Sequence, residues 1–178
     1  MAVEVNLEKL VLRCRQGDTE AFEELFEVFQ PRLKYYIRRL TNCGNADDLL
    51  QDVWLTVIRN LRNLKDARSF DVWLYRIARN KVIDEFRRRD IFAPLPEEHQ
   101  LPSTEDDELT FDPDEAEMLH IALDKLSPPH KEVLTLFFIE QMSYQAIADV
   151  IDCGIGTVRS RLYYAKQSLR KEMEKQNG

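Results

Sequence analysis

Glycine is scarce in this chain, with 5 among 178 residues. The sequence also shows no strand-like alternation of apolar and polar residues, and 32% of its residues are charged. Because all-β folds are built from short alternating strands and glycine-rich turns, these features exclude that class and predict an all-α protein. No stretch approaches about 18 consecutive apolar residues, and the first residues lack a signal-peptide pattern. We therefore expect a soluble, cytoplasmic protein without membrane insertion.

Motifs of catalysis and metal binding are also missing. The three histidines are scattered, and neither a P-loop nor a nucleophile elbow is present. The cysteines lack the paired spacing of zinc ligands or of a disulfide framework; they are Cys14, Cys43 and Cys153. The sequence thus predicts no metal site, no cofactor and no enzymatic activity.

Lysine and arginine are absent from residues 91–117, which contain 10 acidic residues. Residues 1–90 hold 17 basic and 15 acidic residues, and residues 118–178 hold 8 and 7. The net charge of −7 therefore comes from one segment, which also contains four of the 7 prolines. Charge of one sign, low hydrophobicity and proline are typical of a segment that does not pack. We expect two small helical domains, 1–90 and 118–178, joined by an acidic flexible linker, 91–117.

Two helices are predicted between Leu7 and Gly44, and the first extends to about Gln16, where Gly17 stops it. The first begins at Leu7, and Asp18 caps the second. Pro31 lies inside the apolar pattern of the second helix and predicts a kink or a local end there. Cys43 and Gly44 are expected to end this helix.

Residues 46–61 predict a third helix, capped by Asn45, with an apolar seam on one side. The opposite face combines acidic and aliphatic side chains and comprises Asp48, Gln51, Asp52, Leu55 and Arg59, flanked by Leu49 and Ile58. Exposed aliphatics beside a small acidic cluster favour a docking surface, but isolated surface leucines are ordinary. A paired-carboxylate enzyme site is another interpretation of Asp48 and Asp52, although no histidine or metal-ligand pattern accompanies them.

A fourth helix is predicted over residues 70–89, with Ser69 as its cap and Trp73 at the edge of its buried face. Its outer face is basic and includes Arg76, Arg79, Asn80, Ile83 and Arg87. A basic face with an amide and an aromatic suits a phosphate backbone with a few unstacked bases. A solvated helix with arginines at its C-terminal dipole is the alternative.

Residues 142–171 predict two helices joined by the turn Asp152-Cys153-Gly154, with Ser143 capping the first. The second helix buries a seam that includes Val158 and Leu162. Four side chains are expected to point away from that seam, namely Ser160, Tyr163, Tyr164 and Gln167, and basic residues line one flank, namely Arg159, Lys166 and Arg170. This arrangement is typical of a helix-turn-helix whose second helix enters a major groove. A plain helical hairpin whose charged face is only solvated is the alternative interpretation.

Three segments resemble bacterial RNA polymerase sigma factors of the extracytoplasmic-function (ECF) type. MSYQAIA followed by GTVRSRL is similar to their promoter-binding C-terminal domain, ADDLLQDVWL to the segment that grips the β′ clamp helices, and FDVWLYRIARNKVIDEFRRR to the minus-ten segment. The resemblance implies a transcription initiation factor whose partners are core RNA polymerase, promoter DNA and an anti-sigma factor. It also implies that the acidic linker threads the RNA exit channel of the polymerase.

The resemblance assigns residues to each contact. Core polymerase would be contacted by Asp48, Leu49, Gln51, Asp52, Leu55 and Ile58. Minus-ten DNA would be contacted by Trp73, Arg76, Arg79, Asn80 and Arg87, with the loop 63–69 beside a flipped base. Minus-thirty-five DNA would be read by Arg159, Ser160, Tyr163 and Tyr164, with phosphates held by Thr157, Lys166 and Arg170.

Three positions depart from the family pattern. The family commonly has Gly at Asp152 and Pro at Gly154, so the turn could differ, and it often has Arg at Tyr164. Because tyrosine cannot read guanine bidentately, the usual base preference there is in doubt. A stand-alone helix-turn-helix repressor or a helical adaptor are rival interpretations, but neither gives a role to both the third-helix face and the two basic helices.

Overall fold

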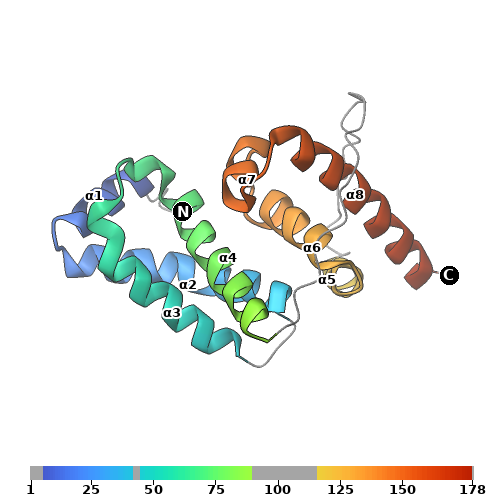
Figure 1. Ribbon diagram of the computed structural model, residues 1–178, viewed down its shortest axis with the longest axis horizontal. Helices are drawn as coiled ribbons and strands as arrows, with labels where there is room; N and C mark the ends of the chain where they lie inside the picture. Colours follow the sequence, from blue (N-terminus) through green and yellow to red (C-terminus); the bar gives the residue numbers. More distant parts are fainter. Residues whose placement is uncertain (1–5, 42–44, 90–115, 178) are drawn as a thin grey trace. The chain divides into compact units, whose positions relative to one another are not determined.

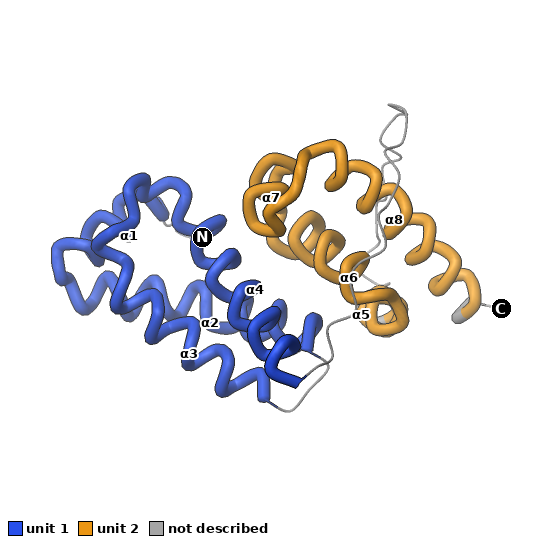
Figure 2. Tube along the Cα trace, viewed as in Figure 1, with its two compact units in different colours: residues 1–92 blue, residues 93–178 orange. Residues whose placement is uncertain are grey.

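The computed structural model describes residues 6–41, 45–89 and 116–177, and the regular elements of these residues are all helical (Figure 1). The helices form two compact units, within residues 1–92 and 93–178, which we call unit 1 and unit 2 (Figure 2). The predicted all-α fold with two small domains is confirmed. The predicted linker, 91–117, lies outside the described residues except for its last two, which begin α5. None of the described helices has the length and apolar composition needed to cross a membrane.

The described residues of unit 1 form four α-helices and two short 3-10 turns. The elements are α1 (Leu7–Arg15), α2 (Thr19–Thr41), α3 (Ala46–Asn60), η1 (Leu61–Asn63), η2 (Ala67–Ser69) and α4 (Phe70–Arg88). Aromatic pairs join α2 to α4: the ring centroids of Tyr36 and Tyr75 are 5.1 Å apart, and those of Phe29 and Phe70 are 5.4 Å apart. Edge-on pairs of this kind add to the apolar area that the rings bury. The core therefore fixes α4 against α2 and leaves its other side at the surface.

Pro31 does not end α2, although the sequence predicts a kink or an end there. The helix continues through Pro31 to Thr41. Proline lacks the amide that would bond the preceding turn, but the fully buried Leu25 and Leu33 hold both halves of α2 on the same core. The predicted end at Cys43 and Gly44 lies outside the described residues.

Four predicted caps occupy the expected positions, but only two side chains act as caps. Asp18 Oδ1 accepts from the Ala21 amide at 3.0 Å, and Ser143 Oγ accepts from the Ala146 amide at 3.1 Å. Asn45 and Ser69 make no side-chain cap. Asn45 instead donates its amide to Glu85, and the Ser69 hydroxyl donates to the Asp66 carbonyl. At Asn45 and Ser69, hydrogen bonds to other partners thus replace the predicted bond to the helix N-terminus.

The described part of unit 2 starts with α5 (Ala116–Asp124), which is followed by α6 (Pro128–Leu134). A π-helical turn, η4 (Thr135–Ile139), leads to α7 (Tyr144–Ile151), and α8 (Ile155–Asn177) packs against α5, α6 and α7. The predicted turn between α7 and α8 is confirmed. Asp152 adopts the left-handed conformation there, with φ 56° and ψ 56°. Aspartate tolerates this region better than most residues, so the turn forms without glycine at this position.

Candidate nucleic-acid interface

The exposed side of α3 combines carboxylates with aliphatic side chains, as predicted. We call this surface the α3 outer face; it comprises Asp48, Gln51, Asp52, Leu55 and Ile58, all exposed. Leu55 is 42% exposed and Ile58 57% exposed, on a helix whose other side is buried. Apolar side chains that stay this accessible beside carboxylates are available to a partner.

Leu49 does not belong to this face. It is 3% exposed and lies in the core of unit 1, so its predicted exposure on the flank is wrong. Leu49 follows Ala46 by three residues and precedes Val53 by four, which places it on the same side of the helix as both. Ala46 and Val53 are buried, and Leu49 extends their seam.

An ion-pair cluster next to the α3 outer face involves Asp47. Lys34 Nζ lies 2.7 Å from the Asp47 carboxylate and Arg38 lies 3.9 Å from it. The hydrogen bond from Lys34, with the charge of Arg38, holds the pKa of Asp47 below its usual value. These pairs join α2 to the start of α3, and they leave Asp48 and Asp52 on the outer face.

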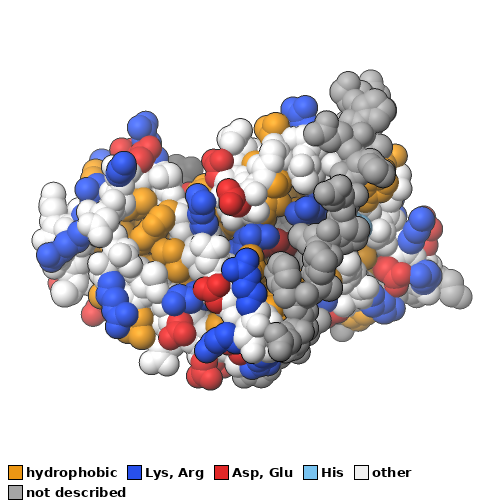
Figure 3. Space-filling model, viewed as in Figure 1, with side chains coloured by type: hydrophobic (Ala, Val, Ile, Leu, Met, Phe, Trp, Pro, Cys, Tyr) orange, Lys and Arg blue, Asp and Glu red, His pale blue; other side chains and the backbone are white. Residues whose placement is uncertain are grey.

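The outer side of α4 is basic. Arg76, Asn80 and Arg87 are exposed there, and Arg79 and Ile83 are half-buried. Figure 3 shows apolar side chains reaching the surface of unit 1 among Lys and Arg side chains. A surface of this composition can follow a phosphate backbone while an aromatic or apolar side chain meets a base.

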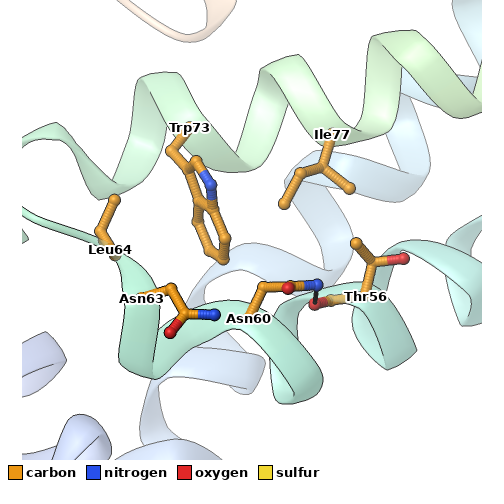
Figure 4. A pocket seen from close by; sticks show the side chains of 6 residues that line it. All are labelled: Thr56, Asn60, Asn63, Leu64, Trp73 and Ile77. Atoms are coloured by element: carbon orange, nitrogen blue, oxygen red, sulfur yellow. Dashed lines mark hydrogen bonds between the residues drawn. The ribbon is translucent and has the colours of Figure 1, made fainter.

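A shallow hollow of about 280 Å³ lies between α3, η1 and α4 (Figure 4). Its lining is Thr56, Asn60, Asn63, Leu64, Trp73 and Ile77. The structure thus brings Trp73 together with the predicted loop at Asn63 and Leu64, while Asn80 is not part of the lining. Thr56 and Asn60 were missed by sequence reasoning; their spacing of four residues on an exposed side of α3 was the available signal. Asn60 Nδ2 donates to the Thr56 carbonyl at 2.9 Å.

Two arginines at the end of α4 pair with one carboxylate, that of Glu85. Arg89 Nε lies 2.7 Å from Glu85 Oε1, and Arg88 pairs with the other oxygen of the same carboxylate. Glu85 is buried, so this carboxylate partly neutralises Arg88 and Arg89. Sequence reasoning had given Glu85 no role.

On α8 the structure confirms that Arg159 and Arg170 are exposed and that Thr157, Tyr163 and Tyr164 are partly so. The rings of Tyr163 and Tyr164 meet edge-on with centroids 5.5 Å apart. Two aromatic side chains and a guanidinium therefore share the accessible side of the second helix of the helix-turn-helix.

Ser160 and Lys166 are buried, contrary to prediction. Ser160 is 1% exposed, and its hydroxyl lies within hydrogen-bonding distance of the Gly156 and Thr157 carbonyls. Lys166 is 7% exposed, and its Nζ lies 5.1 Å from the centroid of the Phe137 ring. Because α8 contacts α5, α6 and α7, its buried arc is wider than the single seam that its sequence predicts. Both side chains therefore lie outside the accessible side of α8.

Comparison with known proteins agrees with this division of the chain. The family model described as Sigma-70 region 2 matches residues 25–91, and that described as Sigma-70, region 4 matches residues 116–169. The ECF RNA polymerase sigma-E factor of Haemophilus influenzae is 29% identical, covering 98% of this chain and 98% of its own. The RNA polymerase sigma-H factor of Pseudomonas aeruginosa is 32% identical, covering 94% and 93%.

Solved structures show the same fold. The structure of CnrH in complex with the cytosolic domain of CnrY superposes with a TM-score of 0.67 at 23% identity, covering 93% of this chain and 95% of that one. The sigma factor RpoE in complex with the anti-sigma factor NepR, from Bartonella quintana, gives 0.66 at 22%, covering 86% and 96%. The family models and the relatives over nearly the full length show that this chain belongs to the sigma-70 family as an ECF-type sigma factor, a transcription initiation factor that directs RNA polymerase to promoters.

Proposed function

We propose that residues 1–90 dock on core RNA polymerase through the α3 outer face, with the β′ clamp helices as the partner. The observation that carries this assignment is the exposure of Leu55 and Ile58, 42% and 57%, beside the carboxylates of Asp48 and Asp52. Aliphatic side chains supply area for docking, and the carboxylates select a basic partner surface and fix its orientation. Leu49 supports this face from the core and does not contact the partner.

The same domain opens and holds minus-ten DNA along α4. Arg76, Arg79 and Arg87 follow the phosphates, and Asn80 adds a polar contact. Trp73 borders the hollow lined by Asn60 and Asn63, where an unstacked base would meet an aromatic ring and amide groups together. Stacking and amide hydrogen bonds are the usual means of holding a base taken out of the duplex.

Residues 118–178 anchor the complex on minus-thirty-five DNA through α8. Arg159, Tyr163 and Tyr164 read base edges, and Thr157 and Arg170 hold phosphates. Each of the two domains binds a short element weakly, and linking them through residues 91–117 makes the second contact intramolecular. The protein has no catalytic centre or cofactor of its own in this proposal. It acts in the cytoplasm, where an anti-sigma factor covers the same faces and holds it inactive.

Charge reversal on the α3 outer face tests the docking proposal. The double variant Asp52→Lys with Leu55→Glu should abolish co-purification with core polymerase, and its helix content and thermal midpoint should stay unchanged. The matched control is Glu23→Lys with Leu12→Glu. Leu12 is 41% exposed on α1, and Glu23 is exposed on α2, so both changes lie away from α3. Undiminished binding of the first variant, or equal loss in both, would show that the α3 outer face is not the docking site.

A further inference from the structure

The first turn of α8 presents one large apolar side chain between two residues that have no side chain. Ile155 is 40% exposed, and Gly154 and Gly156 flank it. A Cβ added at either glycine would meet no atom within 4 Å. Ile155 therefore projects from the protein with open space on both sides.

The fold itself gives no reason for the glycine at position 156. Its backbone is not in the left-handed region that favours glycine, since Gly17 has the one positive φ among the described glycines. It lies inside a helix, where glycine is less favourable than alanine. Neither packing nor backbone geometry requires the open space beside Gly156. Such space suits the close approach of a bound molecule.

The neighbouring exposed residues of α8 indicate what that molecule is. Residues four apart share one side of a helix, so Ile155, Arg159 and Tyr163 form one stripe, with Arg159 exposed and Tyr163 half-buried. In a helix-turn-helix the N-terminal residues of the second helix contact base edges in the major groove. Thymine is the base that offers an apolar group there, its C5-methyl. A phosphate would gain nothing from an isoleucine.

We propose that Ile155 is a specificity-determining residue that contacts the methyl group of a thymine in the minus-thirty-five element, next to the base read by Arg159. Gly156 contributes by leaving room for the DNA to approach this turn. The assignment rests on the proposed binding of minus-thirty-five DNA by α8 and adds a base preference that Arg159 and the tyrosines do not provide.

Uracil scanning tests the contact directly, because uracil differs from thymine by that methyl group alone. A promoter is first selected from a library by run-off transcription with the holoenzyme. Each thymine of its upstream element is then replaced by uracil, and holoenzyme binding is measured for the wild type and for Ile155→Ala. Burial of a methyl group corresponds to roughly fourfold in affinity, so one replacement should weaken wild-type binding by about that factor. The same replacement should leave Ile155→Ala unaffected, and Leu12→Ala should behave as the wild type.

A second variant separates the contact from a folding effect. Gly156→Ala should leave the thermal midpoint of the protein unchanged or raise it, and it should weaken binding to all selected promoters because the added methyl group occupies the approach space. A flat uracil scan in the wild type, or an equal loss in Ile155→Ala, would overturn the assignment. So would weaker assembly of Ile155→Ala with core polymerase in the absence of DNA, since that result identifies the turn as a protein-docking site.

Failure of this inference and failure of the proposed function give different results. If Arg159→Ala lowers discrimination within the upstream element and the uracil scan is flat, α8 binds that element but Ile155 does not read it. If Ile155→Ala and alanine variants of Arg159, Tyr163 and Tyr164 all leave upstream discrimination intact, α8 does not read the upstream element, and both the inference and the proposed role of α8 are wrong.

Discussion

The side-chain amide of Asn45 donates a hydrogen bond to Glu85 Oε1 over 3.0 Å and thereby joins the start of α3 to the end of α4. Glu85 is 9% exposed and also pairs with Arg88 and Arg89. One buried carboxylate thus connects the helix that carries the proposed polymerase contact to the helix that carries the proposed minus-ten contact. It also lowers the positive charge that the end of α4 offers to DNA.

Replacing Glu85 by glutamine should therefore have two effects. The free energy of unfolding should fall by about 1–2 kcal/mol, because hydrogen bonds to a charged partner are lost or weakened. Binding of duplex DNA by the free protein should become tighter and more dependent on salt, because Arg88 and Arg89 would then be available to phosphates. Denaturant titration and DNA binding at several salt concentrations measure the two effects. Glu23→Gln, at an exposed position, is the control, and an unchanged salt dependence in Glu85→Gln would contradict the second expectation.

Leu49 and Leu55 should separate stability from polymerase binding. Leu49→Ala should lower the free energy of unfolding by about 2–5 kcal/mol, because Leu49 is buried and the change leaves a cavity. Leu55→Ala removes a 42% exposed side chain, and the free energy of unfolding should change by less than about 0.5 kcal/mol. Core polymerase binding should fall in Leu55→Ala and, for the folded fraction, not in Leu49→Ala. Loss of polymerase binding in Leu49→Ala without loss of stability would show that Leu49 belongs to the docking surface.

Helical periodicity predicted most of the core and failed where a helix touches several neighbours. The seam of α8 through Val158, Leu162 and Leu169 is buried, as its spacing predicts. Ser160 and Lys166 are buried as well. The helix contacts α5, α6 and α7, and Lys166 lies over the Phe137 ring of η4; the sequence of α8 alone does not reveal those contacts. The role of Glu85 depends on Asn45, 40 residues away in the chain, and local patterns do not predict such a contact.

Arg159 and Lys166 should respond differently to replacement by alanine. Arg159→Ala should lower discrimination at one or two adjacent base pairs, by roughly 1–3 kcal/mol if the contact to guanine is bidentate. Lys166 lies over the Phe137 and Phe138 rings, so Lys166→Ala should lower the stability of unit 2 and leave the relative preference among promoters unchanged. Promoter competition assays and thermal melting measure the two properties. Lys166→Met retains most of the buried side chain and should recover part of the stability; a stable Lys166→Ala with altered promoter preference would contradict the buried role.

Acid should weaken the fold partly through Asp18. The Ala21 amide donates to Asp18 and Arg13 pairs with it at 2.8 Å, and these contacts hold the pKa of Asp18 below its ordinary value of 3.8. A carboxylate with a lowered pKa stabilises the folded state fully above that ordinary value, and the contribution is lost as the pH falls below it. Asp18→Asn keeps an acceptor for the Ala21 amide but does not titrate. Its free energy of unfolding should lie below that of the wild type near neutral pH, and the difference should shrink as the pH falls below 3.8 and through the lowered pKa of Asp18. A constant difference across this range would show that Asp18 does not contribute through its charge.

The acidic residues of the segment 91–117 should reduce DNA binding by the free protein. Residues 1–90 and 118–178 are each nearly neutral, and the 10 acidic residues of 91–117 are attached to both. Charges on so short a tether repel phosphates that come within a Debye length of about 8–10 Å. Neutralising Glu105, Asp106, Asp107 and Glu108 to amides should raise polymerase-independent DNA affinity and steepen its salt dependence. Initiation with core polymerase should weaken, because the segment would lose its attraction to the positive RNA exit channel of the polymerase. The control neutralises the same number of exposed carboxylates on α2, namely Glu20, Glu23, Glu24 and Glu27. Equal effects of the two variants would show that net charge, and not its position between the DNA-binding domains, sets the affinity of the free protein.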